Sequence, residues 1–195
     1  STAILALLSL GLTACGGGGG SGGGGGTFTG STGTLNLSVT DAPVDDASRV
    51  LVQFTGIAVK PKEGDAVEIP LRGDSQSCRN LLDGIPPAPT PSGEATVRCV
   101  DLLAFQGNRR AQLLQGEELE AGEYTWMRLD VDAERGVLDS IIVLNDGSEE
   151  SLYIPSGEQS GLKLNTPFNI IAGAQHNFVI DFDLRKSLNK PRGFP

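Results

Sequence analysis

Apolar and polar side chains alternate along most of the chain after residue 34. Residues 35–39 read LNLSV, and an apolar period of two predicts a half-buried strand. Residues 50–54 read VLVQF and predict a second strand of the same kind. The apolar parity then shifts to residues 57–59 across Gly56, which predicts a β-bulge at this glycine.

The same alternation continues toward the carboxyl end. It predicts strands at 67–71, 97–105, 123–132, 141–144, 151–154, 168–171 and 176–184. Asn145, Asp146 and Gly147 form a hairpin-turn signal between two of these strands. Residues 109–120 carry three leucines around Gly116 and predict the one short helix. Many short strands with Gly and Pro turns predict an all-β sandwich.

One short segment narrows the type of sandwich. Leu119 to Tyr124 reads LEAGEY and resembles the Leu-x-x-Gly-x-Tyr entry to a late strand in immunoglobulin-like and transthyretin-like β-sandwiches. The resemblance implies a tyrosine corner, in which the tyrosine hydroxyl bonds back to the loop backbone. The expected fold class is therefore an immunoglobulin-like or transthyretin-like sandwich.

An apolar run occupies the amino-terminal end. Residues 3–12 are apolar except for Ser9 and Gly11. A helix that crosses a bilayer needs about 20 apolar residues, so this run suits the h-region of a secretory signal. We expect residues 1–14 to be a signal peptide whose basic n-region precedes Ser1. The alternative is an ordinary amino-terminal helix with Cys15 buried in it.

Residues 12–15 read LTAC and resemble the lipobox of bacterial lipoproteins. The resemblance implies cleavage before Cys15, acylation of its thiol and amino group, and attachment to a lipid bilayer. Stable anchoring takes at least two lipid chains or equivalent signals. Gly16 stands where an Asp would favour the inner membrane, so the resemblance implies the outer membrane in a Gram-negative host.

A glycine tract separates this segment from the strands. Residues 16–26 are glycine except for Ser21, and no Lys occurs before Lys60, so the tract is not a phosphate-binding loop. Polyglycine buries nothing and loses much entropy on ordering. We therefore expect residues 15–33 to be a lipidated cysteine and flexible linker, and residues 34–195 to be one sandwich domain.

Charge and cysteine content restrict the partners. The formal net charge is −9, with a pI near 4.6, which argues against nucleic acid as a partner. Assigning Cys15 to lipid leaves Cys78 and Cys99, which we expect to form a disulfide in an oxidising compartment. Two unrelated buried thiols are the alternative. Two cysteines and one histidine do not make a zinc site.

Several segments together resemble one family. They are residues 37–43, 50–59, 100–103, 119–129, 160–164 and 181–187. Together they resemble the bacterial domain-of-unknown-function family numbered 4382, over about residues 33–195. The most specific parts are the TDAP opening and the FDLRKS close. The resemblance implies a lipoprotein with a sandwich domain, no assigned chemistry, and a final strand beyond Pro195.

Candidates for catalysis are few. The only histidine, His176, shares its strand parity with Phe178, Ile180 and Phe182. A histidine on an apolar face is more often a packing residue than a base. We therefore expect no enzymatic activity and no cofactor.

Paired carboxylates suggest a different chemistry. Asp130 and Asp132 lie on the polar face of the 123–132 strand, and Asp181 and Asp183 lie opposite the apolar face of the last strand. If these strands were neighbours, the four carboxylates would converge and offer oxygen ligands to Ca²⁺. The alternative is a set of solvated carboxylates that form ion pairs with nearby arginines.

Trp126 and Arg128 are candidate ligand-binding residues. The alternation places them with Tyr124 on the polar face of the same strand. An exposed tryptophan can stack on a sugar or on a partner side chain. The alternative is that a neighbouring loop or strand covers Trp126.

Together these features predict a lipid-anchored, extracytoplasmic module of the cell envelope, with a binding or structural role and no catalysis. An envelope protein or a glycan is the expected ligand. The alternative is a carbohydrate-binding or Ca²⁺-dependent adhesion module at the cell surface.

Overall fold

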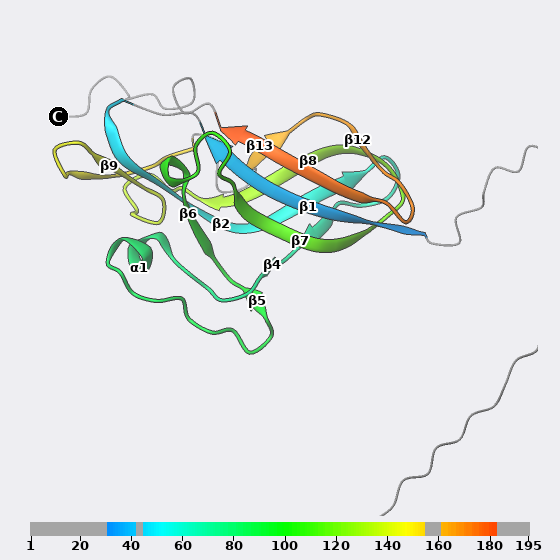
Figure 1. Ribbon diagram of the computed structural model, residues 1–195, viewed down its shortest axis with the longest axis horizontal. Helices are drawn as coiled ribbons and strands as arrows, with labels where there is room; N and C mark the ends of the chain where they lie inside the picture. The colour runs from blue at the N-terminus through cyan, green and yellow to red at the C-terminus, as the bar shows by residue number, and fades with distance from the viewer. Residues whose placement is uncertain (1–30, 42–44, 155–160, 183–195) are drawn as a thin grey trace, which may run out of the picture.

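Two β-sheets face each other and form the sandwich body of the protein (Figure 1). The computed structural model describes residues 31–41, 45–154 and 161–182. The smaller sheet contains β13 (Gln175–Phe182), β1 (Thr32–Asp41) and β7 (Ala111–Glu120), in that order. The larger sheet has the order β10-β9-β2-β8-β11, with β12, β3 and β6 also paired to its strands. The all-β sandwich expected from the alternation is confirmed.

The strands of the larger sheet have the following bounds: β2 Ala47–Pro61, β3 Val67–Ile69, β6 Arg98–Asp101, β8 Gly122–Asp132, β9 Ile141–Leu144, β10 Glu149–Ser151, β11 Leu162–Leu164 and β12 Phe168–Ile170. Two further short strands, β4 (Leu71–Arg72) and β5 (Glu94–Ala95), pair only with each other.

Strand β1 is the centre of the smaller sheet. Leu35, Leu37 and Val39 are fully buried, as the alternation predicts. The strand pairs in parallel with β13 and antiparallel with β7. It begins at Thr32. The predicted signal peptide and most of the linker lie outside the described residues.

Strand β2 organises the larger sheet. It is 15 residues long and pairs with β3, β6, β8 and β9. The register of its pairing with β8 shifts between Phe54 and Gly56, which confirms the predicted bulge. Because of this bulge, Phe54 on one side and Ile57 and Val59 on the other all point into the core and are fully buried.

The core lies between the two sheets. Aromatic rings link them: Phe54 lies 6.5 Å from Phe182, and Phe168 lies 5.1 Å from Tyr124 and 5.2 Å from Phe178, measured between ring centroids. These contacts join β2, β8 and β12 of one sheet to β13 of the other. The inward faces of both sheets therefore close around one apolar cluster.

The helix predicted for residues 109–120 is wrong, because this segment forms strand β7. Leu113 and Leu114 are consecutive and both buried, which imitates the apolar spacing of a helix. A bulge accounts for them: Leu37 pairs with Leu114 and Ser38 with Gln112, so Leu113 is an extra residue in β7. Gly116 adopts φ 71°, and its N–H donates to Asn36 Oδ1 at 2.7 Å. Only a glycine takes this backbone conformation at little cost.

Three other predicted strands differ in their bounds. The 97–105 segment is β6 followed by a 3₁₀ turn, η1 (Leu102–Ala104). The 67–71 segment divides into β3 and β4 at Pro70, which cannot donate to a ladder. Strand β10 spans Glu149–Ser151, so the predicted 151–154 strand overlaps it only at Ser151. The turn before it is confirmed, with Gly147 N–H donating to Leu144 O at 3.0 Å.

A short helix was missed in the sequence. Helix α1 spans Cys78–Leu82, and the Ser77 side chain caps it by accepting a hydrogen bond from the Asn80 N–H. Five residues are too few for a recognisable helical period. In the part of the chain that the structure describes, no helix has the length and apolar character needed to cross a bilayer.

The tyrosine corner is present, but Tyr124 lies on a different face from the one predicted. Its hydroxyl donates to the Glu120 carbonyl at 2.9 Å. Lys60 pairs with Trp126 and Pro61 with Tyr124, so Thr125 is an extra residue in β8. This irregularity reverses the side-chain parity. Tyr124 is therefore 2% exposed in the core and does not share a face with Trp126.

Candidate functional site

Trp126 is half-buried on the outer face of β8. The Lys163 Nζ lies 4.4 Å from its ring centroid, and the Arg128 Cζ lies 5.8 Å away. Lys163 belongs to β11, the strand next to β8. This fits the interpretation that a neighbouring strand covers Trp126. A sugar that stacked on the ring would have to compete with these two cations.

Arg128 is engaged by carboxylates on the same face. Its Nε lies 2.6 Å from Asp130 Oδ1, and its Nη2 lies 3.1 Å from Glu68 Oε1. The hydrogen bond to Asp130 is the main cause that raises the pKa of Arg128. Asp132 Oδ2 accepts a hydrogen bond from Gln53 Nε2 at 3.0 Å. Both predicted carboxylates of β8, Asp130 and Asp132, therefore serve local side chains.

The four predicted carboxylates do not converge. Asp130 and Asp132 lie in β8 of the larger sheet, whereas Asp181 lies in β13 of the smaller sheet, which pairs with β1. Convergence would require neighbouring strands, and these strands belong to different layers. Asp183 lies outside the described residues. Within residues 31–41, 45–154 and 161–182, no three His, Cys, Asp or Glu side chains group to hold a metal.

His176 is a packing residue, as its strand parity predicts. Its Nε2 accepts a hydrogen bond from the Ile171 N–H at 2.9 Å. Its ring centroid lies 6.3 Å from that of Phe178. Because Nε2 is occupied by a backbone donor, that nitrogen does not serve as a free base in this arrangement.

A second region projects from the sandwich body. We call residues 73–98 the lobe; the chain leaves after β4, forms α1, and returns through β5 to β6 (Figure 1). Cys78 at the start of α1 is disulfide-bonded to Cys99 on β6, with the sulfurs 2.05 Å apart. The predicted cysteine pairing is therefore present at the base of the lobe.

Backbone hydrogen bonds close the lobe on itself. Gly73 N–H donates to Gly93 O at 2.8 Å, and Ser75 and Ala88 exchange two bonds of 2.9 and 2.8 Å. Residues 85–91, which include Ala88, read IPPAPTP. Each proline fixes its own φ and restricts the residue before it to extended conformations. The segment 85–91 at the outside of the lobe is therefore stiff, although few of its side chains are buried.

An open hollow of about 560 Å³ lies beneath this proline run. Its lining includes Gln76, Leu81, Ile85, Pro86, Pro87 and Arg98. Gln76 is 8% exposed; its Nε2 donates to the Ile85 carbonyl at 2.9 Å. Its Oε1 is buried and has no hydrogen-bond partner among the described atoms. Buried polar atoms without partners are uncommon in proteins and call for an explanation.

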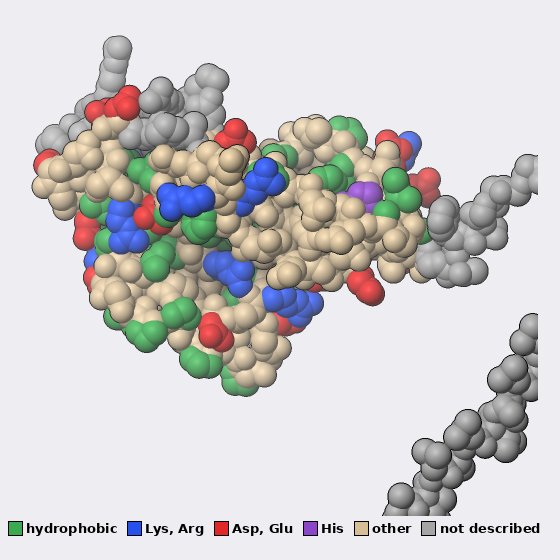
Figure 2. Space-filling model, in the orientation of Figure 1, with side chains coloured by type: hydrophobic (Ala, Val, Ile, Leu, Met, Phe, Trp, Pro, Cys, Tyr) green, Lys and Arg blue, Asp and Glu red, His purple; other side chains and the backbone are tan. Residues whose placement is uncertain are grey.

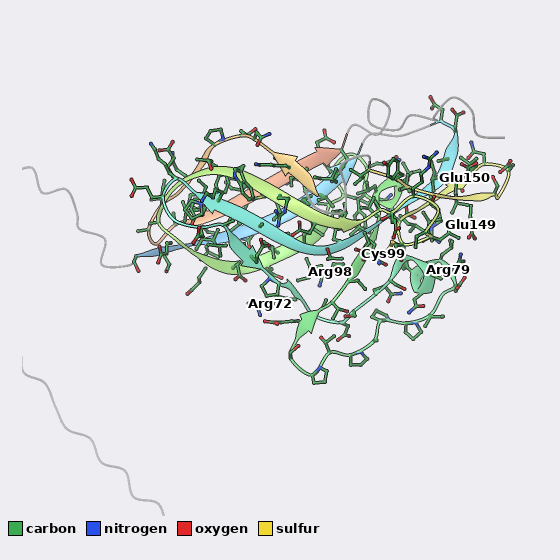
Figure 3. The ribbon with its side chains drawn as sticks, turned by 180° about the vertical axis from the view of Figure 1, so that it is seen from behind. Arg72, Arg79, Arg98, Cys99, Glu149 and Glu150 are labelled. Atoms are coloured by element: carbon green, nitrogen blue, oxygen red, sulfur yellow. A yellow bond between two sulfur atoms is a disulfide. The ribbon has the colours of Figure 1, made fainter. Side chains whose placement is uncertain are left out.

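Arg98 is the cation of the hollow (Figure 3). Its Nη1 donates to the Gln112 carbonyl at 3.1 Å, and its Nη2 donates to the Arg72 carbonyl. None of the described carboxylates lies within ion-pair distance of it, in contrast to Arg72, which contacts Glu94 and Glu117. Burial lowers the pKa of Arg98. The guanidinium is thus partly desolvated.

Comparison with known families gives one result. Residues 32–193 match the family described as Domain of unknown function (DUF4382). The chain belongs to this family. Neither the curated proteins nor the solved structures gave a match. The family description assigns no chemistry, so any function has to be argued from the geometry.

Gln76 and Arg98 were not among the residues predicted from the sequence. The proline run and the two cysteines marked the lobe, but neither indicates which polar residues lie beneath it. A parallel bridge pairs Gln76 with Arg98 across the base of the lobe. This pairing of distant segments sets the backbones of the two residues side by side.

Proposed function

We propose that the protein is a lipid-anchored binding module of the cell envelope, held outside the cytosol by an acylated Cys15. The Cys78–Cys99 disulfide is the observation that supports this most strongly. Disulfides persist in oxidising compartments and are rare in the cytosol. Of the three cysteines in the chain, the pair leaves only Cys15, which follows a short apolar run as a lipobox cysteine does.

The binding role is supported by the hollow in the lobe. It combines a buried acceptor without a partner among the described atoms, a cation with no described carboxylate within ion-pair distance, and exposed apolar side chains. Ligand sites are typically concave, largely apolar and supplied with a few polar groups. We propose no catalysis, because the single histidine accepts a backbone hydrogen bond.

Anchoring is tested by producing the chain with its natural leader in a bacterial host and separating membrane from soluble fractions. We expect the protein in the membrane fraction, with Cys15 as its first residue and a mass that includes acyl chains. Cys15→Ser abolishes both, whereas Cys78→Ser leaves acylation unchanged. Recovery of an unmodified amino terminus in the cytosolic fraction would overturn the proposal.

The alternative, a carbohydrate-binding or Ca²⁺-dependent adhesion module, has less support. Lys163 and Arg128 already occupy the ring of Trp126, and Asp130 is paired with Arg128. A thermal melt with and without millimolar Ca²⁺ tests the metal, since a ligand of the native state raises Tm by mass action. A Tm that rises with Ca²⁺ in the wild type and not in Asp130→Asn would favour the alternative.

A further inference from the structure

Three features of the hollow in the lobe select the chemistry of a ligand. The first comes from Gln76, whose buried Oε1 requires a hydrogen-bond donor. Gln76 is one of the residues that line the hollow. A glutamine whose amide N–H is used and whose carbonyl is not is half satisfied.

The second feature is the guanidinium of Arg98. A guanidinium carries five N–H donors, and the structure directs hydrogen bonds from Nη1 and Nη2 to two backbone carbonyls. The group lines the hollow and lacks a carboxylate partner among the described residues. A carboxylate is the natural complement, because arginine and carboxylate form paired, charge-assisted hydrogen bonds.

The two polar groups lie together. Gln76 and Arg98 are directly paired on adjacent extended segments, where Gln76 N–H donates to Val97 O and Cys99 N–H donates to Gln76 O. Both residues also line the hollow. A ligand that brings a donor and an anion close together therefore suits this floor.

The third feature is an exposed apolar surface. Ile85 is 49% exposed, and Pro86 and Pro87 beside it are exposed as well. Residues 84–93 carry no charged side chain, in a chain whose formal net charge is −9. Green side chains appear along the rim of the projecting region in Figure 2. An aliphatic side chain of the ligand would remove this surface from water.

The rim adds a restriction. Asp74 also lines the hollow, and its carboxylate is exposed. It repels a second negative charge and accepts hydrogen bonds from neutral N–H groups. This disfavours phosphate and runs of acidic residues, and it favours a ligand with one carboxylate followed by a neutral, N–H-bearing backbone.

We propose that the hollow binds the free carboxyl terminus of a polypeptide whose last residue is aliphatic. The terminal carboxylate contacts Arg98, a backbone N–H of the ligand reaches Gln76 Oε1, and the aliphatic side chain lies against Ile85 and Pro86. Capture of a terminal carboxylate is a known mode of peptide recognition. The inference deepens the binding role proposed above and rests on it for the location of the partner.

The test is a calorimetric titration of the full chain with acetyl-Gly-Ala-Leu as its free acid, with the same peptide as its carboxamide, and with inorganic phosphate. We expect the free acid to bind, and the carboxamide to bind at least about tenfold more weakly because it lacks the charge-assisted bonds. In ¹⁵N spectra, the free acid should shift the backbone amides of Gln76, Ile85 and Cys99. Equal affinities for acid and carboxamide, or phosphate binding as tight as the acid, would overturn the proposal.

Matched variants locate the site. Arg98→Gln should weaken the free acid about tenfold, whereas Arg109→Gln, which removes the same charge from an exposed position, should not. Because Arg98 also holds two carbonyls, Ile85→Asp serves as a second variant; it alters an exposed wall residue and adds a repelling charge. Unchanged binding by Ile85→Asp contradicts the proposal. None of these readouts depends on Cys15, so failure here is distinguishable from failure of the anchoring proposal.

Discussion

In the sandwich body, β1 alone buries Leu35, Leu37 and Val39 completely, whereas the exposed side of the lobe leaves Ile85 49% exposed. The body closes around one hydrophobic cluster, to which both sheets contribute side chains. The lobe contributes Cys78, Leu81 and Leu82 to a smaller cluster that it shares with β2, β6 and β9. Apolar burial therefore stabilises the body, while a disulfide and a few backbone bonds shape the lobe.

This difference separates stability from recognition. A residue in the body core is constrained by its packing, because interiors are filled at crystal-like density. The lobe carries its polar groups on a stiff, weakly buried frame. Among the described residues, its hollow can therefore keep a buried acceptor without a partner and a cation outside ion-pair distance of any carboxylate, which the body core would not tolerate.

The largest effect is expected from emptying the body core. Phe54→Ala removes a fully buried ring that contacts Phe182, and it should lower the free energy of unfolding by about 3–5 kcal/mol. Urea unfolding measures it. The control is Ile85→Ala in the lobe, which should change stability by less than about 0.5 kcal/mol. Equal losses in the two variants would erase the distinction between body and lobe.

Removal of the disulfide should rank second. The bridge spans 21 residues, and the chain-entropy argument gives a loss of about 3 kcal/mol for Cys78→Ser/Cys99→Ser. Hydrogen exchange should show faster exchange in α1, with the amides of β1 still protected. Cys15→Ser is the control, since it leaves the bridge intact. Loss of protection in β1 together with α1 would mean that body and lobe unfold as one unit.

The tyrosine corner should contribute less. Tyr124→Phe removes the hydroxyl that donates to Glu120 O, at an expected loss of about 1 kcal/mol. Tyr153→Phe, at the exposed second tyrosine, is the control.

The same tyrosine predicts a pH effect. Burial raises the pKa of Tyr124, and the charge of Glu120 adds to it. The neutral phenol is thus favoured in the folded state, and its contribution is complete below the ordinary tyrosine pKa of about 10. It is lost as pH rises through the folded-state pKa. Ultraviolet titration should show one tyrosine ionising later than the other; simultaneous ionisation would contradict a buried corner.

The smallest effect is expected at the surface of the lobe. Arg79 hydrogen-bonds Asp83 and lowers the pKa of that carboxyl. Arg79→Ala should return this pKa toward its ordinary value, as measured by carboxyl ¹³C titration. Exposed ion pairs contribute little, so the urea midpoint at neutral pH should not move measurably. Any contribution from the pair is present above the ordinary Asp pKa and is lost on acidification. An unchanged Asp83 titration would show that the pair does not form in solution.

Local pattern sufficed for most of the body. The alternation in residues 35–39 and 50–54 predicted two central strands, and Gly56 predicted the bulge between the two halves of β2. Leu119 to Tyr124 predicted the tyrosine corner, whose two partners are only four residues apart. Each of these features depends on neighbours in the sequence, so the sequence carries its signal directly.

Two of the errors share one cause. Leu113 and Leu114 suggested a helix because the bulge that turns both inward depends on pairing with Leu37 and Ser38 of β1, which are distant in the sequence. Tyr124 was placed on the outer face because the irregularity at Thr125 depends on pairing with β2. A single extra residue reverses side-chain parity, and alternation alone does not reveal it.

The amino-acid sequence by itself determined the all-β class, the central strands, the cysteine pairing and the stiff proline run, because these follow from side-chain period, cysteine count and proline geometry. Only the tertiary structure decided that Asp181 lies in a different layer from Asp130, that Lys163 covers Trp126, and that Gln76 and Arg98 share the floor of one hollow. Those outcomes depend on which distant strands pair, and that choice is made by the whole core rather than by any one segment.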